Sequence, residues 1–331
     1  MIVEIRGAGF KNKGAQLMLA TVCERLREAF PEVKLCIPVN KAQYDGLMMY
    51  DLRCSVPHPA YWKAPYYLLR DIASNLKHIK KPSGLKRTCN LLRDAACDVI
   101  LLSGFADSLG LLRKGEPDAL IDISGYAFGD KWGARGTKGV AKRFRLYKKQ
   151  NKPVIMLSQM LGPFKEPGQA EAFAKLAGNA DLIYAREKES FEHARPLVRD
   201  SEKLRMAPDI TIPSSPHGLN EEQSPYTCIV PNSKLLEPNP QGQDWKGVYV
   251  PRLIRTAHHL QGRGLEVKIL QHEYKQGDTK LVDTLAERLN AVEVVRDFDP
   301  RVLKGILGGA QIVIGSRFHS LVSTLSMGVP A

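Results

Sequence analysis

Short apolar runs alternate with longer amphipathic stretches along this chain, and this alternation limits the folds that it can adopt. The apolar runs are Ile2–Ile5, Val33–Ile37, Val99–Leu102, Leu120–Ile123, Val154–Leu157, Leu182–Tyr184, Thr227–Val230, Val267–Leu270, Val292–Val295 and Ile312–Ile314. The helix-length segments between them include Gly14–Ala29, Arg186–Val198, Trp245–Leu260, Thr279–Leu289 and Pro300–Leu307. Short buried strands that alternate with helices form parallel sheets from right-handed βαβ units, so the sequence predicts an α/β protein.

The length of the chain and one turn-rich stretch predict two domains. A chain of 331 residues suits two domains of about 150 residues each. The stretch 212–225 is polar and holds three prolines in fourteen residues, which is typical of a linker. We therefore expect domains at 1–211 and 225–331, with a linker at about 212–224. A parallel sheet would normally receive another strand after Gly328–Ala331, so the second domain is expected to be truncated.

Charge and cysteine content restrict the partners and the compartment. The 48 basic and 35 acidic side chains give a net charge of +13, which favours nucleic acid, an anionic membrane or a phosphate-bearing substrate without choosing among them. The six cysteines form no C-x-x-C pair, as expected in a reducing cytosol. Met1–Arg6 carries charges where a signal peptide has an apolar core, and no apolar stretch reaches about 18 residues. We expect a cytoplasmic protein.

A glycine-rich segment, Arg6–Gln16, follows the first predicted strand and opens a helix. Its glycines, Gly7, Gly9 and Gly14, let the backbone turn sharply and approach a ligand, and the helix start offers N–H groups to an anion. The spacing matches neither G-x-G-x-x-G nor the phosphate-binding P-loop. The segment is either an anion-binding turn or a turn that binds nothing.

Two polar segments, Asp122–Asp130 and Ser158–Pro163, each stand at the end of a predicted strand. Ligands of open α/β sheets bind at the carboxyl ends of the strands. Ser124, Gly125 and Asp130 are small or polar where a packed core would hold bulk. Each segment alone is either a loop or a site, and their equivalent positions in one sheet favour a site.

The last predicted helix carries an arginine and a histidine at its start. Ser316 is expected to cap this helix, which should end near Gly328. The spacing i, i+3, i+4, i+7 predicts a buried face of Phe318, Leu321, Val322 and Leu325. Arg317 and His319 then lie at the first turn. An arginine there can bind phosphate or carboxylate through bidentate hydrogen bonds from its guanidinium. The alternative is an arginine paired with a surface carboxylate and a histidine packed at a domain face.

Taken in order, these segments resemble the polysaccharide pyruvyl transferase family. The matching positions are Gly7, Gly9, Asn12 and Gly14; Gln159 with Gly162–Pro163; Ala185–Glu187 with Ser190; Pro208–Asp209; and Arg317, His319, Gly328 and Pro330. Two departures, Ala15–Gln16 in place of an acidic residue and Ser124–Tyr126 in place of a glycine triplet, both concern the acceptor side. The matches span residues 7 to 330.

The resemblance implies a fold, a reaction and the substrate that each domain binds. The fold would be glycosyltransferase-B-like, with two Rossmann-like domains that face a cleft. The reaction would move a pyruvyl group from phosphoenolpyruvate onto two hydroxyls of a sugar, which forms a cyclic ketal on a polysaccharide or its lipid-linked precursor. The N-terminal domain would bind the acceptor and the C-terminal domain the donor, and neither a metal nor a cofactor is implied.

This chemistry assigns roles to particular residues. A proton must reach the methylene carbon, and cations must hold the phosphate and carboxylate. We predict His319 as the acid and Asp209 as the base for the sugar proton, although Asp209 could equally cap a turn. Predicted donor ligands are Arg317, Arg186, Lys234 and Ser316. Predicted acceptor ligands are Gly9, Asn12, Gly14, Ser124, Asp130 and Gln159.

Two basic regions carry aromatic residues. The segment Lys131–Lys152 holds nine Lys or Arg and no acid, with Trp132, Phe144 and Tyr147 among them. In the second region, 61–87, aromatic residues precede a basic run: Tyr61, Trp62, Tyr66 and Tyr67, then Lys77, Lys80, Lys81, Lys86 and Arg87. Such a pattern suits either the inner face of an anionic membrane, where a lipid-linked acceptor would lie, or an ordinary solvated helix face.

Two other functional classes stay open. A nucleotide-sugar glycosyltransferase or epimerase of the same fold would use the same helix start for a pyrophosphate. A non-catalytic protein that binds an anionic surface is supported by charge alone. No segment matches a nucleic-acid-binding module, so we expect no nucleic-acid partner.

Overall fold

The computed structural model describes residues 1–38, 44–55, 111–112, 116–218, 224–238, 244–290 and 292–331. The predicted strand at Val99–Leu102 and the basic region at 61–87 lie outside these residues. In the described part of the chain, no helix is both long and apolar enough to cross a bilayer.

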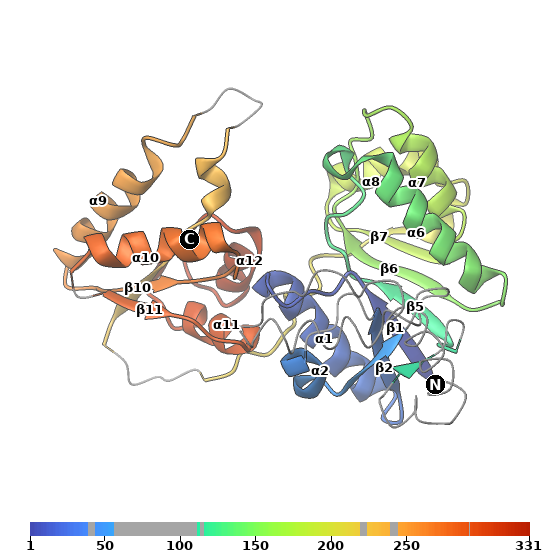
Figure 1. Cartoon of the computed structure of the whole chain (residues 1–331), viewed down its shortest axis with the longest axis horizontal. Coiled ribbons are helices and arrows are strands. Elements are labelled where there is room, and N and C mark those ends of the chain that lie inside the picture. Colours follow the sequence, from blue (N-terminus) through green and yellow to red (C-terminus); the bar gives the residue numbers. More distant parts are fainter. Residues whose placement is uncertain (39–43, 56–110, 113–115, 219–223, 239–243, 291) are drawn as a thin grey trace, which may run out of the picture. The chain divides into compact units, whose positions relative to one another are not determined.

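The chain forms two compact units. The first unit consists of Met1–Gly9 and Val22–Pro208, and the second of Phe10–Thr21 and Asp209–Ala331. The segment 10–21 therefore groups with the second unit, whereas the sequence predicted one boundary near 212–224. Each unit is built around one parallel sheet (Figure 1).

The first unit has a parallel sheet in the order β4-β3-β2-β1-β5-β6-β7-β8. Its strands are β1 (Ile2–Arg6), β2 (Lys34–Pro38), β3 (Leu52–Ser55), β4 (Leu111–Leu112), β5 (Ala119–Asp122), β6 (Val154–Gln159), β7 (Leu182–Ala185) and β8 (Leu204–Met206). Its helices are α2 (Tyr44–Met49), α6 (Gly133–Lys148), α7 (Gln169–Ala177), α8 (Lys188–Ala194) and the second half of α1 (Lys13–Ala29). Neighbouring strands run parallel throughout, as the alternating pattern predicted.

Helix α6 covers this sheet with an apolar face and one buried ion pair. Its buried residues Val140, Phe144 and Tyr147 recur every three to four positions, so one side of the helix packs into the core. Glu4 of β1 is fully buried, pairs with Arg143 and accepts a hydrogen bond from the Tyr147 hydroxyl at 3.1 Å. Burial raises the pKa of Tyr147, so this hydroxyl stays protonated and keeps donating.

The second unit has a parallel sheet in the order β11-β10-β9-β12. Its strands are β9 (Tyr226–Val230), β10 (Glu266–Leu270), β11 (Val292–Val295) and β12 (Ile312–Gly315). Its helices are α9 (Tyr249–Gln261), α10 (Gln276–Arg288), α11 (Pro300–Gly308), α12 (Phe318–Ser326) and a short 3-10 turn at Ser233–Leu236.

Strand β9 is central and buried on both faces. Cys228 and Val230 point into the cluster that includes Leu303 of α11. Ile229, one residue away, points into the opposite cluster with Leu253 of α9. A strand covered on both sides shows no regular polar alternation, and the polar Thr227 of β9 is buried with its hydroxyl donating to the Ile312 carbonyl at 2.8 Å.

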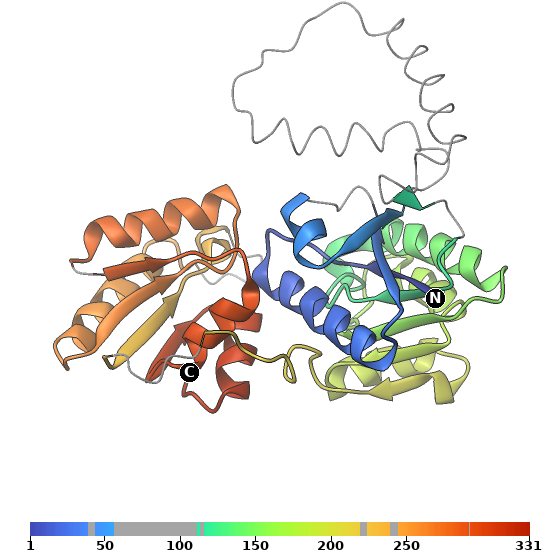
Figure 2. The same ribbon diagram turned by 90° about the horizontal axis from the view of Figure 1, so that it is seen from below.

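The segment 10–21 is attached to the second unit by backbone pairing. Asn12 forms an antiparallel bridge with Glu273, and the Lys13 amide donates to the carbonyl of His272 at 3.0 Å. The first half of α1, in dark blue, accordingly lies beside the orange and red elements in Figure 2. Nothing in the local sequence pattern signals this pairing.

Helix α12 contradicts one sequence prediction. Phe318 and Leu325, predicted on the buried face, are 51% and 61% exposed, whereas Ser320, Ser323 and Thr324 are buried. The hydroxyls of Ser320 and Thr324 donate, each at 2.7 Å, to carbonyls three and four residues earlier. Because these hydroxyls are satisfied within the helix, small polar side chains can face the protein without an unpaired group.

The remaining differences concern short elements. The strands β3, β4 and β8 and the helices α2 and α7 were not predicted, and α6 was predicted only as a basic segment. The other described strands begin and end within two residues of their predicted limits. The predicted fold class, α/β with two Rossmann-like sheets, is confirmed.

Candidate active site

Strand order in the second sheet creates a place for a ligand. From β9 the chain proceeds to β10 and β11 on one side, and then crosses to β12 on the other side. The loops that follow β9 and β12 therefore diverge at the carboxyl edge, which is the switch point where α/β proteins bind ligands. The loop after β9 begins at Pro231, and the loop after β12 begins at Ser316.

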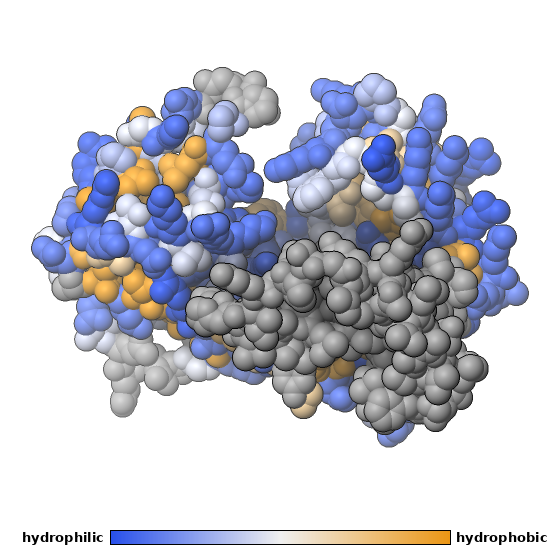
Figure 3. Space-filling model, in the orientation of Figure 1, coloured by the Kyte–Doolittle hydropathy of each residue, from blue (hydrophilic) through white to orange (hydrophobic). Residues whose placement is uncertain are grey.

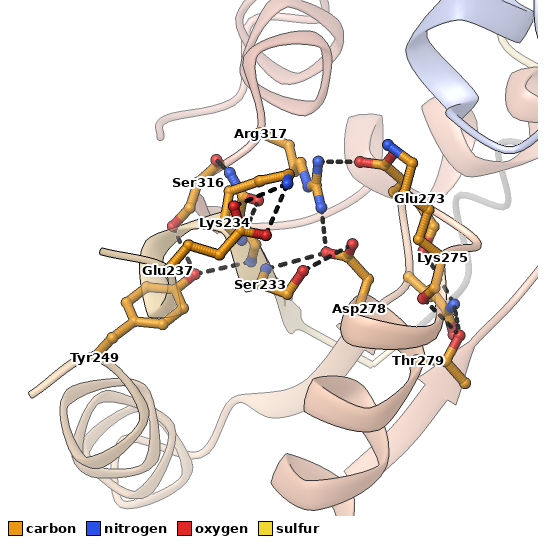
Figure 4. A network of polar contacts seen from close by, with 12 residues as sticks. Ser233, Lys234, Glu237, Tyr249, Glu273, Lys275, Asp278, Thr279, Ser316 and Arg317 are labelled. Carbon is orange, nitrogen blue, oxygen red and sulfur yellow. Dashed lines mark hydrogen bonds and ion pairs between the residues drawn. The ribbon is translucent and has the colours of Figure 1, made fainter. Parts of the chain in front are cut away.

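These two loops are joined by hydrogen bonds (Figure 4). The Asn232 side-chain amide donates to the Ser316 carbonyl at 2.8 Å, and the Tyr249 hydroxyl donates to Ser316 Oγ at 2.9 Å. The backbone amide of Asn232 donates to the same tyrosine hydroxyl at 3.0 Å. Ser316 therefore holds the two loops together. It does not cap α12, whose N-cap residue is Arg317.

Arg317 lies in a buried ion-pair network. Its guanidinium contacts Glu273 through Nη1 and Asp278 through Nη2, and Glu273 also pairs with Lys275. Arg317 is only 9% exposed and its two carboxylate partners are 3% exposed, whereas the alternative drawn from the sequence was a surface carboxylate. The two cations and two carboxylates balance, so the cluster avoids the cost of an uncompensated buried charge.

His319 pairs with Asp209. The His319 Nε2 atom lies 3.6 Å from Asp209 Oδ2, and the two side chains are 16% and 5% exposed. The other carboxylate oxygen accepts from the Thr211 amide at 2.9 Å and from its hydroxyl at 2.7 Å. Asp209 therefore both caps a turn and contacts the histidine. A carboxylate in this position stabilises an imidazolium.

Gly14 provides the space that His319 occupies. A Cβ atom at Gly14 would lie 2.3 Å from both Cγ and Nδ1 of the imidazole, so no larger residue fits without moving the ring. Asn12 caps α1, the helix that contains Gly14, because its Oδ1 accepts a hydrogen bond from the Ala15 amide at 3.1 Å. Gly9, by contrast, has open space around it. The first turn of α1 thus supports the histidine.

Two ionisable residues of this site were missed in the sequence. Lys13 is 2% exposed and donates to Gln16 Oε1 at 2.8 Å and to the Phe298 carbonyl at 2.7 Å. Burial lowers the pKa of Lys13 to about 8, against the opposing charges of two nearby aspartates. Burial, together with the charges of His319 and Arg317, lowers the pKa of His272 to about 3. Its place two residues after the strand-forming run Val267–Leu270 is a signal that could have identified His272.

The carboxyl edge of the first sheet is organised differently. Arg6 pairs with Asp122 and donates to Ser124 Oγ at 2.8 Å. Asp122 Oδ1 accepts from the Ser124 amide at 2.9 Å and from Gln159 Nε2 at 3.1 Å. Gly7 has φ 93°, and a Cβ there would lie 2.4 Å from the Ser124 nitrogen. Gln159 is fully buried, and its Oε1 has no hydrogen-bond partner among the described residues.

The other predicted ligands have local partners. The Asp130 carboxylate accepts from the backbone amides of Lys165 and Glu166 at 3.0 and 3.1 Å, so it joins two loops. Arg186 pairs with the neighbouring Glu187 at 3.2 Å. Lys234 lies in the turn after β9 and pairs with Glu237 at 2.7 Å.

Among the predicted residues, the second unit therefore gathers His319, Asp209, Arg317, Ser316, Lys234, Asn12 and Gly14. The first unit holds Gly9, Ser124, Asp130, Gln159 and Arg186. In the described ranges, no group of three or more His, Cys, Asp and Glu side chains is arranged to hold a metal ion.

Two parallel α/β sheets with polar residues at their carboxyl edges define a glycosyltransferase-B-like protein. Solved structures with this fold include UDP-GlcNAc 2-epimerases from Neisseria meningitidis, bound to UDP-GlcNAc, and from Methanocaldococcus jannaschii, bound to UDP-GlcNAc and UDP. The first is 12% identical with a TM-score of 0.51, covering 99% of this chain and 80% of its own. The second is 11% identical with a TM-score of 0.53, covering 100% of this chain and 83% of its own. At this identity the likeness concerns the fold alone.

The sequence itself identifies the family. Residues 12–331 match the profile of the polysaccharide pyruvyl transferase family, so the chain belongs to that family. The resemblance first recognised from short motifs is thereby confirmed. We found no match among proteins of curated function.

Proposed function

We propose that this protein transfers the pyruvyl group of phosphoenolpyruvate to two hydroxyls of one sugar, on a polysaccharide or its lipid-linked precursor. The observation that carries the proposal is the His319–Asp209 pair at the carboxyl edge of the second sheet, in a member of this family. A histidine held beside a carboxylate can deliver a proton, which this addition to an enol carbon requires.

The reaction balances with one acid and two sugar hydroxyls. His319 gives a proton to the methylene carbon, and the first sugar oxygen bonds to the carbon that carries the phosphate. The proton of that hydroxyl returns to the imidazole, so His319 also takes the role of base that the sequence suggested for Asp209, and the Asp209 carboxylate stabilises the imidazolium. The second hydroxyl then bonds to the same carbon, its proton leaves with phosphate, and the product is a cyclic ketal of pyruvate.

Arg317 and Lys234 are our candidates for contact with the anionic groups of the donor. Arg317 Nε has no hydrogen-bond partner among the described residues, so its N–H group can donate a hydrogen bond to the donor substrate. Lys234 is 47% exposed, and an exposed pair such as that with Glu237 contributes little and can be exchanged for a phosphate. Arg186 belongs to the first unit and is a further candidate.

Acceptor recognition is proposed for the first sheet. The buried Gln159 Oε1 can accept a hydrogen bond from a sugar hydroxyl, since no described residue uses it. Ser124, Gly9 and Asp130 are further candidates in the same unit. Asn12 and Gly14, which the sequence suggested as acceptor ligands, support His319 instead.

The proposal is tested by substrate binding and by product analysis. Isothermal titration with phosphoenolpyruvate, UDP and UDP-GlcNAc should give binding for phosphoenolpyruvate alone. Incubation with phosphoenolpyruvate and a panel of methyl glycosides should release phosphate and give the methyl proton signal of a pyruvate ketal. Binding of UDP without phosphoenolpyruvate would instead favour a nucleotide-sugar enzyme.

We also propose a peripheral contact with the inner face of an anionic membrane, through α6. Six basic residues are exposed on one side of this segment at alternating spacings of four and three: Lys131, Arg135, Lys138, Lys142, Arg145 and Lys149. None of them forms an ion pair with a described residue, and Trp132 beside them is 54% exposed. Hydrophilic side chains also predominate at the outer rim of the first unit in Figure 3. Phe144 and Tyr147 are buried, so they do not contribute to this face.

Vesicle sedimentation tests this contact. Binding to phosphatidylcholine vesicles should require added phosphatidylserine and should weaken as salt increases. Replacing Lys138, Lys142 and Arg145 by glutamine should weaken binding about a hundredfold, from about 1 kcal/mol per basic residue. The same change at Arg252, Arg255 and Arg263 of the second unit removes equal charge and should have little effect. Equal losses in both variants would make the attraction one of net charge only.

A further inference from the structure

Asp278 connects three separate elements of the second unit. It lies at the start of α10 and is 3% exposed. Its Oδ1 accepts from the Ser233 amide at 3.1 Å and contacts Arg317, while its Oδ2 accepts from the Ser233 hydroxyl at 3.0 Å. One carboxylate therefore joins the turn after β9, helix α10 and the loop after β12 (Figure 4).

The same contacts restrict the movement of Arg317. Glu273 binds one terminal nitrogen of the guanidinium and Asp278 binds the other, so the planar group is held from two sides. Either carboxylate left alone in this buried place would be costly, and the pairing offsets that cost. The chain also packs closely here, because a Cβ at Gly277 would lie 3.0 Å from the Ser233 hydroxyl.

We propose that Asp278 is a positioning residue for the donor anion. It holds the guanidinium of Arg317 in a fixed position relative to the turn that carries Lys234. The two cations therefore present a constant arrangement to the donor anion. This inference rests on the proposed function, in which these two cations hold phosphoenolpyruvate. Asp278 itself need not touch the substrate, because it acts through Arg317 and Ser233.

The test compares Asp278→Asn with Asp283→Asn. Both aspartates lie on α10 and pair with an arginine, but Asp283 is 51% exposed and pairs with Arg296. Asp278→Asn should raise the KM for phosphoenolpyruvate at least about tenfold, which corresponds to about 1.4 kcal/mol. The kcat should stay within about threefold, because the lost contact acts on donor binding. Asp283→Asn should leave both constants unchanged.

A merely structural role predicts a different result. It would lower the melting temperature of Asp278→Asn and leave the KM for phosphoenolpyruvate within about twofold, and that result overturns the inference. A fall in kcat at unchanged KM overturns it as well. If Asp278→Asn does not fold, Ser233→Ala removes only the hydroxyl contact and should still raise the KM, by a smaller factor.

A double-mutant cycle isolates the route through Arg317. The effects of Asp278→Asn and Arg317→Lys on the KM should be less than additive, since both disturb one contact. Additive effects would show that Asp278 does not act through Arg317. Failure of the wild-type protein to bind phosphoenolpyruvate would remove the proposed function, whereas wild-type binding with an unchanged KM in Asp278→Asn removes only the positioning role.

Discussion

The carboxyl edges of the two sheets carry similar residue types in different arrangements. At the first sheet, Arg6, Asp122, Ser124 and Gln159 bind one another in a closed set, and one amide oxygen is left over. At the second sheet, His319 lies beside Asp209, next to elements that carry His272 and Arg317. The first arrangement suits recognition by hydrogen bonds, and the second suits proton transfer.

The comparison also explains why sheet topology alone does not show which edge carries the catalytic residues. Parallel strands bring their carboxyl ends to one edge in both sheets, so both edges gather polar loops. At the second edge, the start of α1 packs against the imidazole of His319 through Gly14. Variants of the two edges should therefore affect different steps of the reaction.

The largest effect is expected at the second edge, from His319→Asn and His319→Gln. Turnover should fall at least about a hundredfold, which is the usual contribution of a positioned proton donor. Affinity for phosphoenolpyruvate should change little, and the alkaline limb of the pH–rate profile should disappear. Normal turnover at saturation with weak donor binding would instead make His319 a donor ligand.

A second prediction concerns acid stability of the second unit. The folded-state pKa of His272 is lowered from 6.5 to about 3. At a pH between these two values, His272 is protonated in the unfolded chain and neutral in the folded chain. The free energy of unfolding should therefore fall as pH falls below 6.5, by about 1.4 kcal/mol per pH unit. Urea titrations at pH 7 and pH 5 should show a loss of about 2 kcal/mol that is absent in His272→Gln. Equal losses in both proteins would contradict the assignment.

The third prediction uses two glycines that lie in helices. Alanine normally stabilises a helix relative to glycine, but at Gly14 its Cβ would displace the His319 ring. Gly14→Ala should lower kcat about tenfold, within the range that a misplaced proton donor costs. Gly139→Ala, in the interior of α6, meets no neighbouring atom and is the matched control. Equal activity of the two variants would show that the packing of His319 on α1 is unimportant.

The smallest effect is expected at the first edge. Gln159→Met removes the amide and nearly preserves its shape, so it should raise the KM for the acceptor about fivefold, close to the value of one hydrogen bond. The KM for phosphoenolpyruvate should not change. Steady-state kinetics with each substrate varied in turn measures both constants. A change in the donor constant alone would reverse the roles that we propose for the two edges.

The sequence by itself determined the elements and the family. The apolar run Val154–Leu157 predicts a buried parallel strand, because a strand covered on both faces cannot alternate with polar residues. The pair Arg317 and His319 is visible as a motif, since its residues are close in sequence. Local patterns of this kind need no knowledge of the rest of the chain.

The tertiary structure decided what surrounds those residues. Arg317 is buried by Glu273 and Asp278, which lie 44 and 39 positions earlier, and no local pattern links residues so far apart. The first turn of α1 likewise joins the second unit through pairing of Asn12 with Glu273. Helix α12 buries its hydroxyl face because those hydroxyls bond within the helix, whereas apolar periodicity predicted the opposite face. In the first two cases, contacts between distant segments decide the surroundings of a residue, and in α12 hydrogen bonds within the helix let a polar face be buried.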